Sequence, residues 1–428
     1  MGDELDAALT ALLGDDEIKV PGLGVIVFKG GKEVYSRFFG SRVLGKKNKP
    51  VTRDTRFRAA SVSKMFTVFT LMQLVERGLI SLDDDAGDYL PCRLRNPACP
   101  RKKITVRMLA SHTSSLRDGK IYSIPPTESV AELVLPRGKF WEDGAHFAPP
   151  AEPVGTFFTY SNLNYGLLGT IIEVVTGQRF DLCQKENLFR QLDIKADYLP
   201  ANLAPPQFDM LGTIYQKKDL FGHWNESGEW FAQVDACAGG QPPKDTVRLQ
   251  NPYAPDFQDE YSLTDYRVGT NATIFSPQGG LRISFEELAH ALEMMMNGGL
   301  YRGRRILSRH SLDEMFRSHW IYDPRSHNGL PYGGTILNYG LGTYRVDGTR
   351  RARLCRRHAV DWLGHTGSAY GLLSGIFFRP NKLDGFVYMM NGEAIAEDTD
   401  SRSLGVFSDN YIWEEKITDA VCNFLVDD

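Results

Sequence analysis

The sequence predicts an α+β fold in which both ends of the chain contribute to one sheet and a helical region lies between them. Strand-like runs occur near the N-terminus, at 22–28 and 33–39, and again near the C-terminus, at 372–378 and 385–390. The middle of the chain carries longer apolar segments with helical character. We therefore expect an antiparallel sheet built from both termini and flanked by helices, with a helical middle domain.

This arrangement predicts one large unit over 1–428 with two subdomains. The sheet subdomain is expected at 1–58 and 335–428, and the mainly helical subdomain at 59–334. Within the latter, 196–269 has weak periodicity and many aromatic and proline residues. A stretch of this kind is typical of a segment that shapes a binding cleft, and a solvated surface insertion is the alternative.

The individual elements follow from local patterns. Lys29-Gly30-Gly31-Lys32 is a hairpin turn between the first two strands, and Ser284 with Glu287 predicts a capped helix start. The other expected elements are, in chain order, helices at 3–14, 62–79, 104–116, 167–175 and 284–297, a strand at 339–346, and a helix at 409–425.

Composition narrows the function classes. The chain has 428 residues, 42% of them hydrophobic, and a net charge of −4 without a basic block, so nucleic acid is not an expected partner. It lacks an apolar run of about 18 residues, and its first twenty residues do not resemble a signal peptide. We expect a soluble protein, cytoplasmic rather than a trimmed exported form; the sequence does not predict the oligomeric state.

The cysteines and histidines do not indicate a metal or cofactor site. None of the six cysteines forms a Cys-x-x-Cys pair, and the histidines and carboxylates show no ligand spacing. Cys92 and Cys99 could bridge a Pro-rich loop, but ordinary thiols in a reducing compartment are favoured. No metal and no cofactor are therefore expected.

The first motif is Ser61-Val62-Ser63-Lys64. Positions three apart share one face of a helix, so the Ser61 hydroxyl and the Lys64 amine can meet. A serine nucleophile needs a base, and a lysine in apolar surroundings can become one because burial lowers its pKa. The alternative is a helix start with a capping serine and a solvated lysine.

The second motif is Tyr160-Ser161-Asn162, directly before the helix at 167–175. Beside the Lys64 ammonium, the pKa of Tyr160 is expected to fall, and the phenol could then shuttle protons to and from a leaving group. Asn162 could hold Lys64 and a substrate amide together. The alternative is a turn with a packed aromatic ring.

The third motif is Gly364-His365-Thr366-Gly367-Ser368, before the last strands. On a strand at the edge of a cleft, His365 and Thr366 would face Ser61, and Gly367 would allow close backbone approach. The N–H groups of Ser61 and Ser368 would form an oxyanion hole. The alternative is a histidine at a strand end. His112, in another polar cluster, is expected to be structural.

Taken together in this order, the three motifs resemble the serine β-lactamase and penicillin-binding protein superfamily. The tyrosine form of the second motif is similar to class C β-lactamases, related D-alanyl-D-alanine carboxypeptidases, D-aminopeptidases and β-lactamase-like esterases. Family-like segments at 111–116, 279–281 and 364–367 extend the resemblance over almost the whole chain. Class A chemistry is disfavoured because a tyrosine begins the second motif.

The resemblance implies a role for each motif residue. Ser61 would be the acylated nucleophile, Lys64 its base and Tyr160 the proton relay. The substrate would contact Asn162, His365, Thr366 and Gly367. Efficient class C enzymes usually carry lysine in place of His365, and a neutral imidazole binds a carboxylate less firmly, so strong β-lactam hydrolysis is less expected.

The sequence therefore predicts a serine hydrolase that acts through an acyl-enzyme on a small-molecule ester, amide or peptide. A D-amino-acid peptide or a small acyl ester is the favoured substrate, with weak β-lactam binding or hydrolysis. One alternative is an acyltransferase that uses the same acyl-enzyme. Another is a catalytically inactive binding or sensor domain, which the intact motifs disfavour. An α/β-hydrolase is disfavoured because no Gly-x-Ser-x-Gly elbow occurs.

Overall fold

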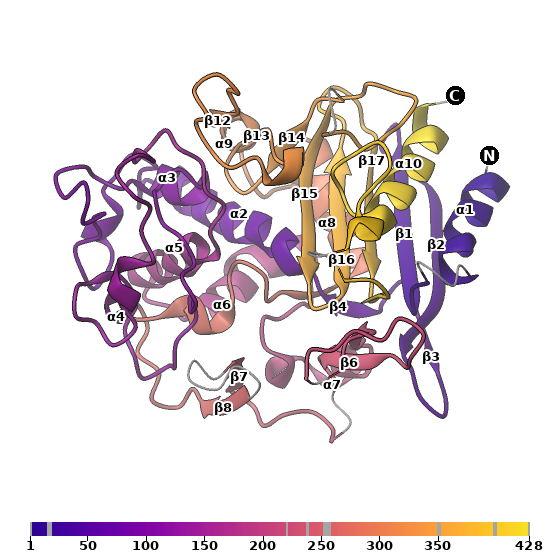
Figure 1. Cartoon of the computed structure of the whole chain (residues 1–428), viewed down its shortest axis with the longest axis horizontal. Coiled ribbons are helices and arrows are strands. Elements are labelled where there is room, and N and C mark those ends of the chain that lie inside the picture. The colour runs from indigo at the N-terminus through magenta and orange to yellow at the C-terminus, as the bar shows by residue number, and fades with distance from the viewer. Residues whose placement is uncertain are drawn as a thin grey trace.

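The computed structural model has two parts, a sheet covered by helices and a neighbouring cluster of helices and loops (Figure 1). It describes residues 2–14, 19–219, 221–236, 239–250, 258–348, 352–396 and 400–426. The N-terminal helix and the C-terminal helix lie side by side against the sheet, so the two ends of the described chain meet in one part of the molecule.

Nine strands form the main sheet, in the order β12-β13-β14-β15-β16-β17-β1-β2-β3, and all neighbours are antiparallel. Val25 on β1 faces Arg37 on β2 and Tyr388 on β17, which joins the two chain ends and confirms the predicted sheet. The strands are β1 (Gly22–Lys29), β2 (Lys32–Val43), β3 (Lys49–Pro50), β12 (Trp320–Ile321), β13 (Asn338–Tyr339), β14 (Tyr344–Val346), β15 (Trp362–Ala369), β16 (Leu372–Phe378) and β17 (Gly385–Met390).

The predicted strand at 339–346 is wrong. Residues 338–339 and 344–346 form separate antiparallel strands, β13 and β14. The chain reverses between them at Gly342, which has φ +65°, and the Gly340 N–H donates to Thr343 O over 2.8 Å. A left-handed glycine ends the extended run that the apolar pattern favours.

Both faces of the sheet are covered. Val25 and Val27 of β1 pack into the same cluster as α1 (Gly2–Gly14) and α10 (Ile412–Val426). Ile26, between them, packs on the opposite side with α8 (Phe285–Met296). This alternation is the two-residue period of a strand, and burial on both faces explains why β1 is almost continuously apolar.

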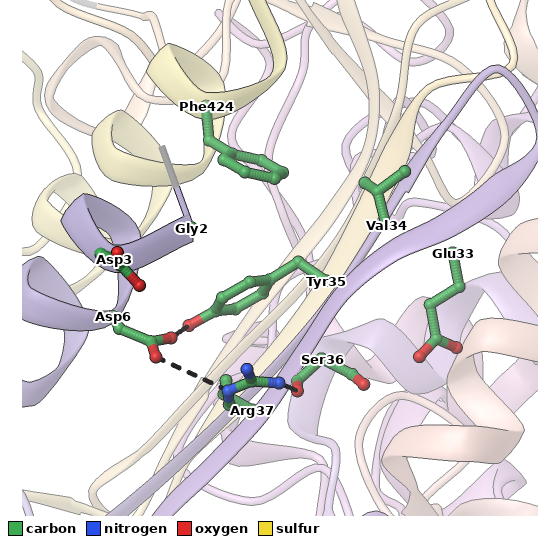
Figure 2. A pocket seen from close by; sticks show the side chains of 9 residues that line it. All are labelled: Gly2, Asp3, Asp6, Glu33, Val34, Tyr35, Ser36, Arg37 and Phe424. Carbon is green, nitrogen blue, oxygen red and sulfur yellow. Dashed lines mark hydrogen bonds and ion pairs between the residues drawn. The ribbon is translucent and has the colours of Figure 1, made fainter.

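A surface hollow lies between α1, β2 and α10 (Figure 2). Within it the Tyr35 hydroxyl donates to Asp6 Oδ1 over 2.5 Å, and Arg37 Nε lies 3.6 Å from Asp6 Oδ2. These polar groups are paired with one another. β2 is four strands away from β15, the strand that carries His365, so the hollow is not part of the candidate site.

The helical part is built around α2 (Ser63–Glu76), which is buried on nearly every side. Ser63, Lys64, Thr67 and Thr70 are buried along with its apolar residues, so this is a core helix without a solvent-facing polar side over most of its length. The other helices are α3 (Val106–Ala110), α4 (Ala131–Val134), α5 (Asn162–Thr176), α6 (Phe180–Gln184), α7 (Pro205–Asp209) and α9 (Arg309–Phe316), and the short helical turns are Ala60–Val62, Ala86–Asp88, Glu142–Gly144, Lys185–Phe189, Arg190–Leu192, Pro200–Asn202, Ala272–Phe275, Tyr332–Gly334 and Ser401–Ser403.

Most predicted helices are confirmed, but one is much shorter than expected. The helix predicted at 104–116 covers only Val106–Ala110. His112 and Ser115 then adopt left-handed φ values of +58° and +69°, which end the helix and turn the polar residues inward. By contrast, α5 ends at Thr176, next to the predicted end at 175, although it begins at Asn162, five residues before the predicted start. Ser284 and Glu287 form the predicted capping box of α8.

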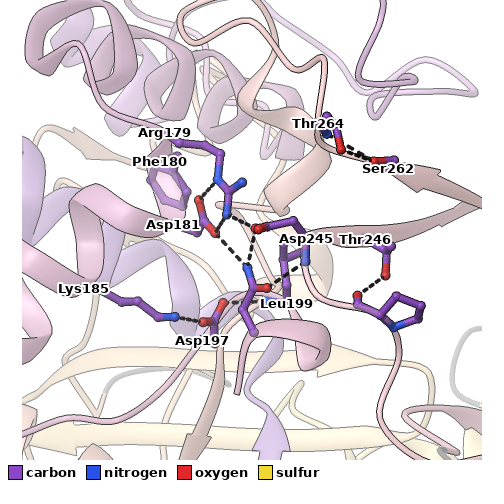
Figure 3. A network of polar contacts seen from close by, with 12 residues as sticks. Arg179, Phe180, Asp181, Lys185, Asp197, Leu199, Asp245, Thr246, Ser262 and Thr264 are labelled. Carbon is purple, nitrogen blue, oxygen red and sulfur yellow. Dashed lines mark hydrogen bonds and ion pairs between the residues drawn. The ribbon is translucent and has the colours of Figure 1, made fainter. Parts of the chain in front are cut away.

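The segment 196–269 contains short strands joined by loops, and residues 220, 237–238 and 251–257, which include Pro252, Tyr253 and Pro255, lie outside the described residues. Ion pairs hold this segment against the helices before it (Figure 3). Arg179, which also pairs with Asp181 over 2.7 Å, pairs with Asp245 of the segment over 2.7 Å, and Lys185 pairs with Asp197. The minor strands are β4 (Arg56–Arg58), β5 (Ile214–Gln216), β6 (Phe231–Val234), β7 (Thr246–Gln250), β8 (Gln258–Ser262), β9 (Arg282–Ser284), β10 (Leu300–Tyr301), β11 (Arg304–Arg305) and β18 (Gly392–Glu393).

The described cysteines are free thiols, including Cys92 and Cys99, which the sequence left open as a bridge. Burial raises the pKa of the Cys92 thiol to about 11, so this thiol stays protonated near neutral pH. Cys237 lies outside the described residues.

Candidate active site

Ser61 lies in a tight helical turn at Ala60–Val62, immediately before α2. Ala60 has φ +46°, a left-handed conformation that costs energy for a residue with a Cβ. Two contacts hold the turn: Ala59 N donates to Leu281 O over 2.8 Å, and Ser374 Oγ donates to Ala59 O over 2.9 Å. The strained turn is therefore held by the residue before β9 and by β16, which fixes the position of the Ser61 hydroxyl.

Lys64, the second residue of α2, is completely buried, and its amine contacts three oxygens. Nζ donates to Ser61 Oγ over 3.0 Å, to Asn162 Oδ1 over 2.9 Å and to Gln278 O over 3.0 Å. Burial lowers the pKa of Lys64 to about 7, although Asp118 nearby opposes the shift. Near neutral pH the amine is therefore present in both protonation states.

The hydrogen-bond partners of Lys64 determine where its N–H groups and its lone pair point once the amine is neutral. Asn162 Oδ1 and Gln278 O can only accept, whereas the Ser61 hydroxyl can also donate. A neutral amine has two N–H groups, which suffice for these two acceptors, and one lone pair. That lone pair then faces the Ser61 O–H, which is the geometry of a base beside a nucleophile.

Tyr160 lies beside this pair, but its ionisation differs from the prediction. The Lys64 ammonium lies over the ring, 4.6 Å from its centroid. Burial raises the pKa of Tyr160 well above 10, while a hydrogen bond with Ser61 opposes the shift. The expected fall in pKa is therefore wrong, because burial outweighs the nearby ammonium. Tyr160 is a protonated phenol, which can donate a proton.

Asn162 joins Lys64 to a residue that the sequence did not single out. Its Oδ1 accepts from Lys64, and its Nδ2 donates to Asp118 Oδ2 over 2.9 Å. Asp118 Oδ1 also accepts from Ser161 Oγ over 2.8 Å and from Leu163 N over 2.9 Å. In the sequence, Asp118 is marked only by its position shortly after the polar cluster that contains His112.

His112 is structural, as expected. Its Nδ1 accepts from Ser161 N and from Asn164 Nδ2, each over 3.1 Å. Its ring lies 4.3 Å from the ring of Tyr160, and burial, with help from Lys64, lowers its pKa well below the usual value. The neutral imidazole therefore packs against the ring of Tyr160.

His365 is close to the site but is only 2% exposed. Its Nδ1 hydrogen bonds to Thr366 O, and its Nε2 lies 3.1 Å from the Tyr339 hydroxyl. Burial and the charge of Lys64 lower its pKa to about 3, so the imidazole is neutral. The sequence predicted that His365 faces Ser61 at the edge of a cleft. In the structure both of its nitrogens make hydrogen bonds within the protein. Thr366 is partly exposed and accepts from the Tyr344 hydroxyl over 2.9 Å.

Gly367 brings β15 against the Ser61 turn. A Cβ at this position would lie 2.6 Å from Ala59 O and 3.0 Å from Ser61 N, so only glycine fits. Ser368 follows it and is exposed. The close approach that the sequence predicts is therefore present, and a joint oxyanion hole of Ser61 and Ser368 stays a prediction.

In the described part of the chain, no three histidine, cysteine or acidic side chains gather into a possible metal site. None of its helices is both long and apolar enough to span a bilayer.

The three motifs that meet in this site all lie within a region that matches a known protein family. The model of the beta-lactamase family matches residues 5–408. The chain belongs to the beta-lactamase family. Its Ser61, Lys64 and Tyr160 thus lie in a beta-lactamase-family domain that covers nearly the whole sequence.

Curated relatives of this beta-lactamase-family protein align over shorter regions. Protein flp of Staphylococcus aureus (strain N315) is 29% identical over 161 residues, which are 38% of this chain and 31% of flp. Penicillin-binding protein 4 of Amycolatopsis lactamdurans is 30% identical over 184 residues, which are 42% of this chain and 44% of that protein. The aligned region spans less than half the length of each relative.

Solved structures share the fold over a larger part of the chain. The octameric penicillin-binding protein homologue from Pyrococcus abyssi has a TM-score of 0.64 at 23% identity, covering 92% of this chain and 74% of that one. A class C beta-lactamase has a TM-score of 0.64 at 18% identity, covering 99% and 96%. A D-stereospecific amidohydrolase from Streptomyces sp. has a TM-score of 0.57 at 21% identity, covering 92% and 95%. These similarities confirm the β-lactamase and penicillin-binding protein fold.

Proposed function

We propose that the protein is a serine hydrolase that forms a covalent acyl-enzyme on Ser61 with esters or amides. The observation that carries this proposal is the state of Lys64, a buried amine 3.0 Å from Ser61 Oγ with a pKa near 7. An amine that is partly neutral at the working pH can take the serine proton as the hydroxyl attacks. A solvated lysine at a helix start would keep its proton and could not do this.

In acylation, Ser61 Oγ bonds to the substrate carbonyl carbon while its proton passes to the neutral Lys64 amine. The negative charge on the former carbonyl oxygen is then held by the N–H groups of Ser61 and Ser368. As the bond to the leaving group breaks, Tyr160 donates its proton to that group, and the proton on Lys64 restores the phenol. Deacylation repeats these steps in reverse order, with water in place of the leaving group.

The substrate that we propose is a small acyl ester or a D-amino-acid peptide, with only weak binding or hydrolysis of β-lactams. His365 supports this choice, because a buried neutral imidazole offers no cation to a substrate carboxylate. The activity named for the Streptomyces structural relative, D-stereospecific amide hydrolysis, is in line with a D-amino-acid substrate.

Intact mass measurement tests the proposal. The protein is incubated with benzylpenicillin and, separately, with p-nitrophenyl butyrate, and p-nitrophenol release is followed in parallel. We expect an acyl adduct that peptide mapping places on Ser61, or turnover of the ester, with the ester favoured over the penicillin. The absence of both adduct and turnover would overturn the proposal in favour of a binding domain.

The rate should depend on pH through Lys64. Its neutral form is the base, so kcat/KM for the ester should rise tenfold per pH unit below about 7 and level off above it. The pKa values of His365 and Tyr160 lie far from this range, so neither should add a step there. A profile from about pH 5 to about pH 9, corrected for spontaneous ester hydrolysis, measures this. A rate that does not change across pH 7 would contradict the assignment of Lys64 as the base.

Replacing Tyr160 by phenylalanine should lower the acylation rate with an alkyl ester, measured in single turnovers, by about 100-fold to 10,000-fold, because the leaving group loses its proton donor. The effect should be much smaller for p-nitrophenyl esters, whose leaving group needs no proton. Measuring both substrates therefore separates proton donation from a general loss of structure. Equal losses on the two esters, or full activity on both, would contradict the role of Tyr160.

A further inference from the structure

Helix α5, which carries Asn162, begins without a cap from its own sequence. Ser161 occupies the capping position, yet its side chain makes no hydrogen bond to the helix. The first N–H groups of a helix need acceptors, and a nearby carboxylate also interacts well with the helix dipole. Asp118, from a different segment, fills this place by accepting from Leu163 N over 2.9 Å.

The same carboxylate determines how Asn162 is oriented. Asp118 Oδ2 accepts from Asn162 Nδ2, so the amide turns its oxygen toward Lys64. The opposite orientation would place an N–H₂ group against the Lys64 ammonium and leave Asp118 without this donor. The chain of contacts from Asp118 through Asn162 to Lys64 thus ends at the amine beside Ser61.

Asp118 is also the carboxylate whose charge acts on Lys64. It favours the ammonium form, against the dominant effect of burial. The other titratable groups around the amine are the neutral imidazoles of His112 and His365, whose pKa values the charge of Lys64 lowers, and the rings of Tyr160 and Tyr165. Around Asp118 itself lie Tyr122, Tyr332, Tyr160 and Arg117, and Arg117 is paired with Glu152.

We propose that Asp118 is a positioning residue of the active site, which caps α5, orients Asn162 and sets the charge balance of Lys64. The inference rests on the proposed serine hydrolase function. It concerns a residue that acts on Ser61 through Asn162 and Lys64, since the carboxylate of Asp118 is hydrogen-bonded to the start of α5 and to Asn162. Without its negative charge, the Lys64 amine should lose its proton at a lower pH.

Labelling by a fluorophosphonate tests this. In that reaction the Ser61 Oγ–P bond forms, the P–F bond breaks with release of fluoride, and the serine proton passes to neutral Lys64. The labelling rate is measured against pH for the wild type and for Asp118→Asn, which keeps the size of the side chain and removes its charge. We expect the midpoint to move down by at least about half a pH unit in the variant. The plateau rate should also fall by about tenfold, because an amide has one acceptor oxygen where the carboxylate has two, so it can accept from the start of α5 or from Asn162 but not from both.

Ser161→Ala is the matched control. It removes the 2.8 Å hydrogen bond to Asp118 Oδ1 but leaves the carboxylate charge, so its midpoint should equal that of the wild type. Should Asp118→Asn fail to fold, Asp118→Ser gives the same test, because it keeps an oxygen near the helix start. A neutral variant whose labelling rate has a lower plateau but the same midpoint pH as the wild type would show that Asp118 is only a structural cap. That result would overturn the inference and leave the proposed function standing. A wild type that is not labelled on Ser61 at any pH would overturn the proposed function and the inference with it.

Discussion

Replacing Ser61 by alanine should remove acyl-enzyme formation completely and lower ester turnover by on the order of 10⁶-fold. Without Oγ no covalent bond to the substrate can form, and the Lys64 amine has only water to activate. The change deletes one hydroxyl from a partly exposed side chain, so the fold should persist. Intact mass after incubation with the ester or with a fluorophosphonate measures the loss, and circular dichroism verifies the fold.

Ser63 provides a control two residues along the same chain. Its hydroxyl accepts from Leu281 N over 3.1 Å and is completely buried. Ser63→Ala should therefore keep the adduct on the Ser61 peptide, whatever its effect on stability. An adduct that persists in Ser61→Ala, or one that disappears only in Ser63→Ala, would refute Ser61 as the nucleophile.

Replacing Lys64 by methionine should lower kcat/KM by at least about 10⁴-fold. Methionine has a similar length and no charge, so it fits an apolar site while leaving the Ser61 hydroxyl without a base. The residual rate should also lose its dependence on pH near 7, since Lys64 is the group beside Ser61 that titrates there. The measurement is the pH profile of ester hydrolysis in the variant and in the wild type.

Lys120 serves as the matched control for this change, because it is an exposed lysine two residues after Asp118. Lys120→Met removes one positive charge from the same region and should leave both the rate and the pH profile nearly unchanged. Loss of activity in both lysine variants would point to a general electrostatic effect. Substantial activity in Lys64→Met, with the step near pH 7 retained, would rule out Lys64 as the base.

The parts of the site that the sequence predicts are those that depend on local geometry. Ser61 and Lys64 are three positions apart at a helix start, and the structure brings their polar atoms within 3.0 Å. Asn162 was expected just before an apolar helix and is the first residue of α5, and its amide makes the expected contact with Lys64. Gly367 was expected where the backbone approaches closely, and its missing Cβ is what lets β15 lie against Ala59 and Ser61.

Other parts depend on contacts between distant segments. Asp118 meets Asn162 across 44 positions of sequence, and nothing in its own neighbourhood marks it as the cap of another helix. The ionisation of Tyr160 reversed the expectation because the Lys64 amine faces the ring and burial governs the phenol. His365 was expected to face a substrate, but Tyr339 and Thr366 O occupy its two nitrogens.

The sequence by itself determined the α+β arrangement, the three motifs and the meeting of Ser61 with Lys64, because periodicity and i,i+3 spacing act over a few residues. It did not determine the proton affinities. The pKa values of Lys64, Tyr160 and His365 follow from how deeply each side chain is buried and from which charges lie near it. The burial of these side chains and the charges around them are both set by the packing of the sheet against the helical part. The tertiary structure therefore makes Lys64 a base near neutral pH.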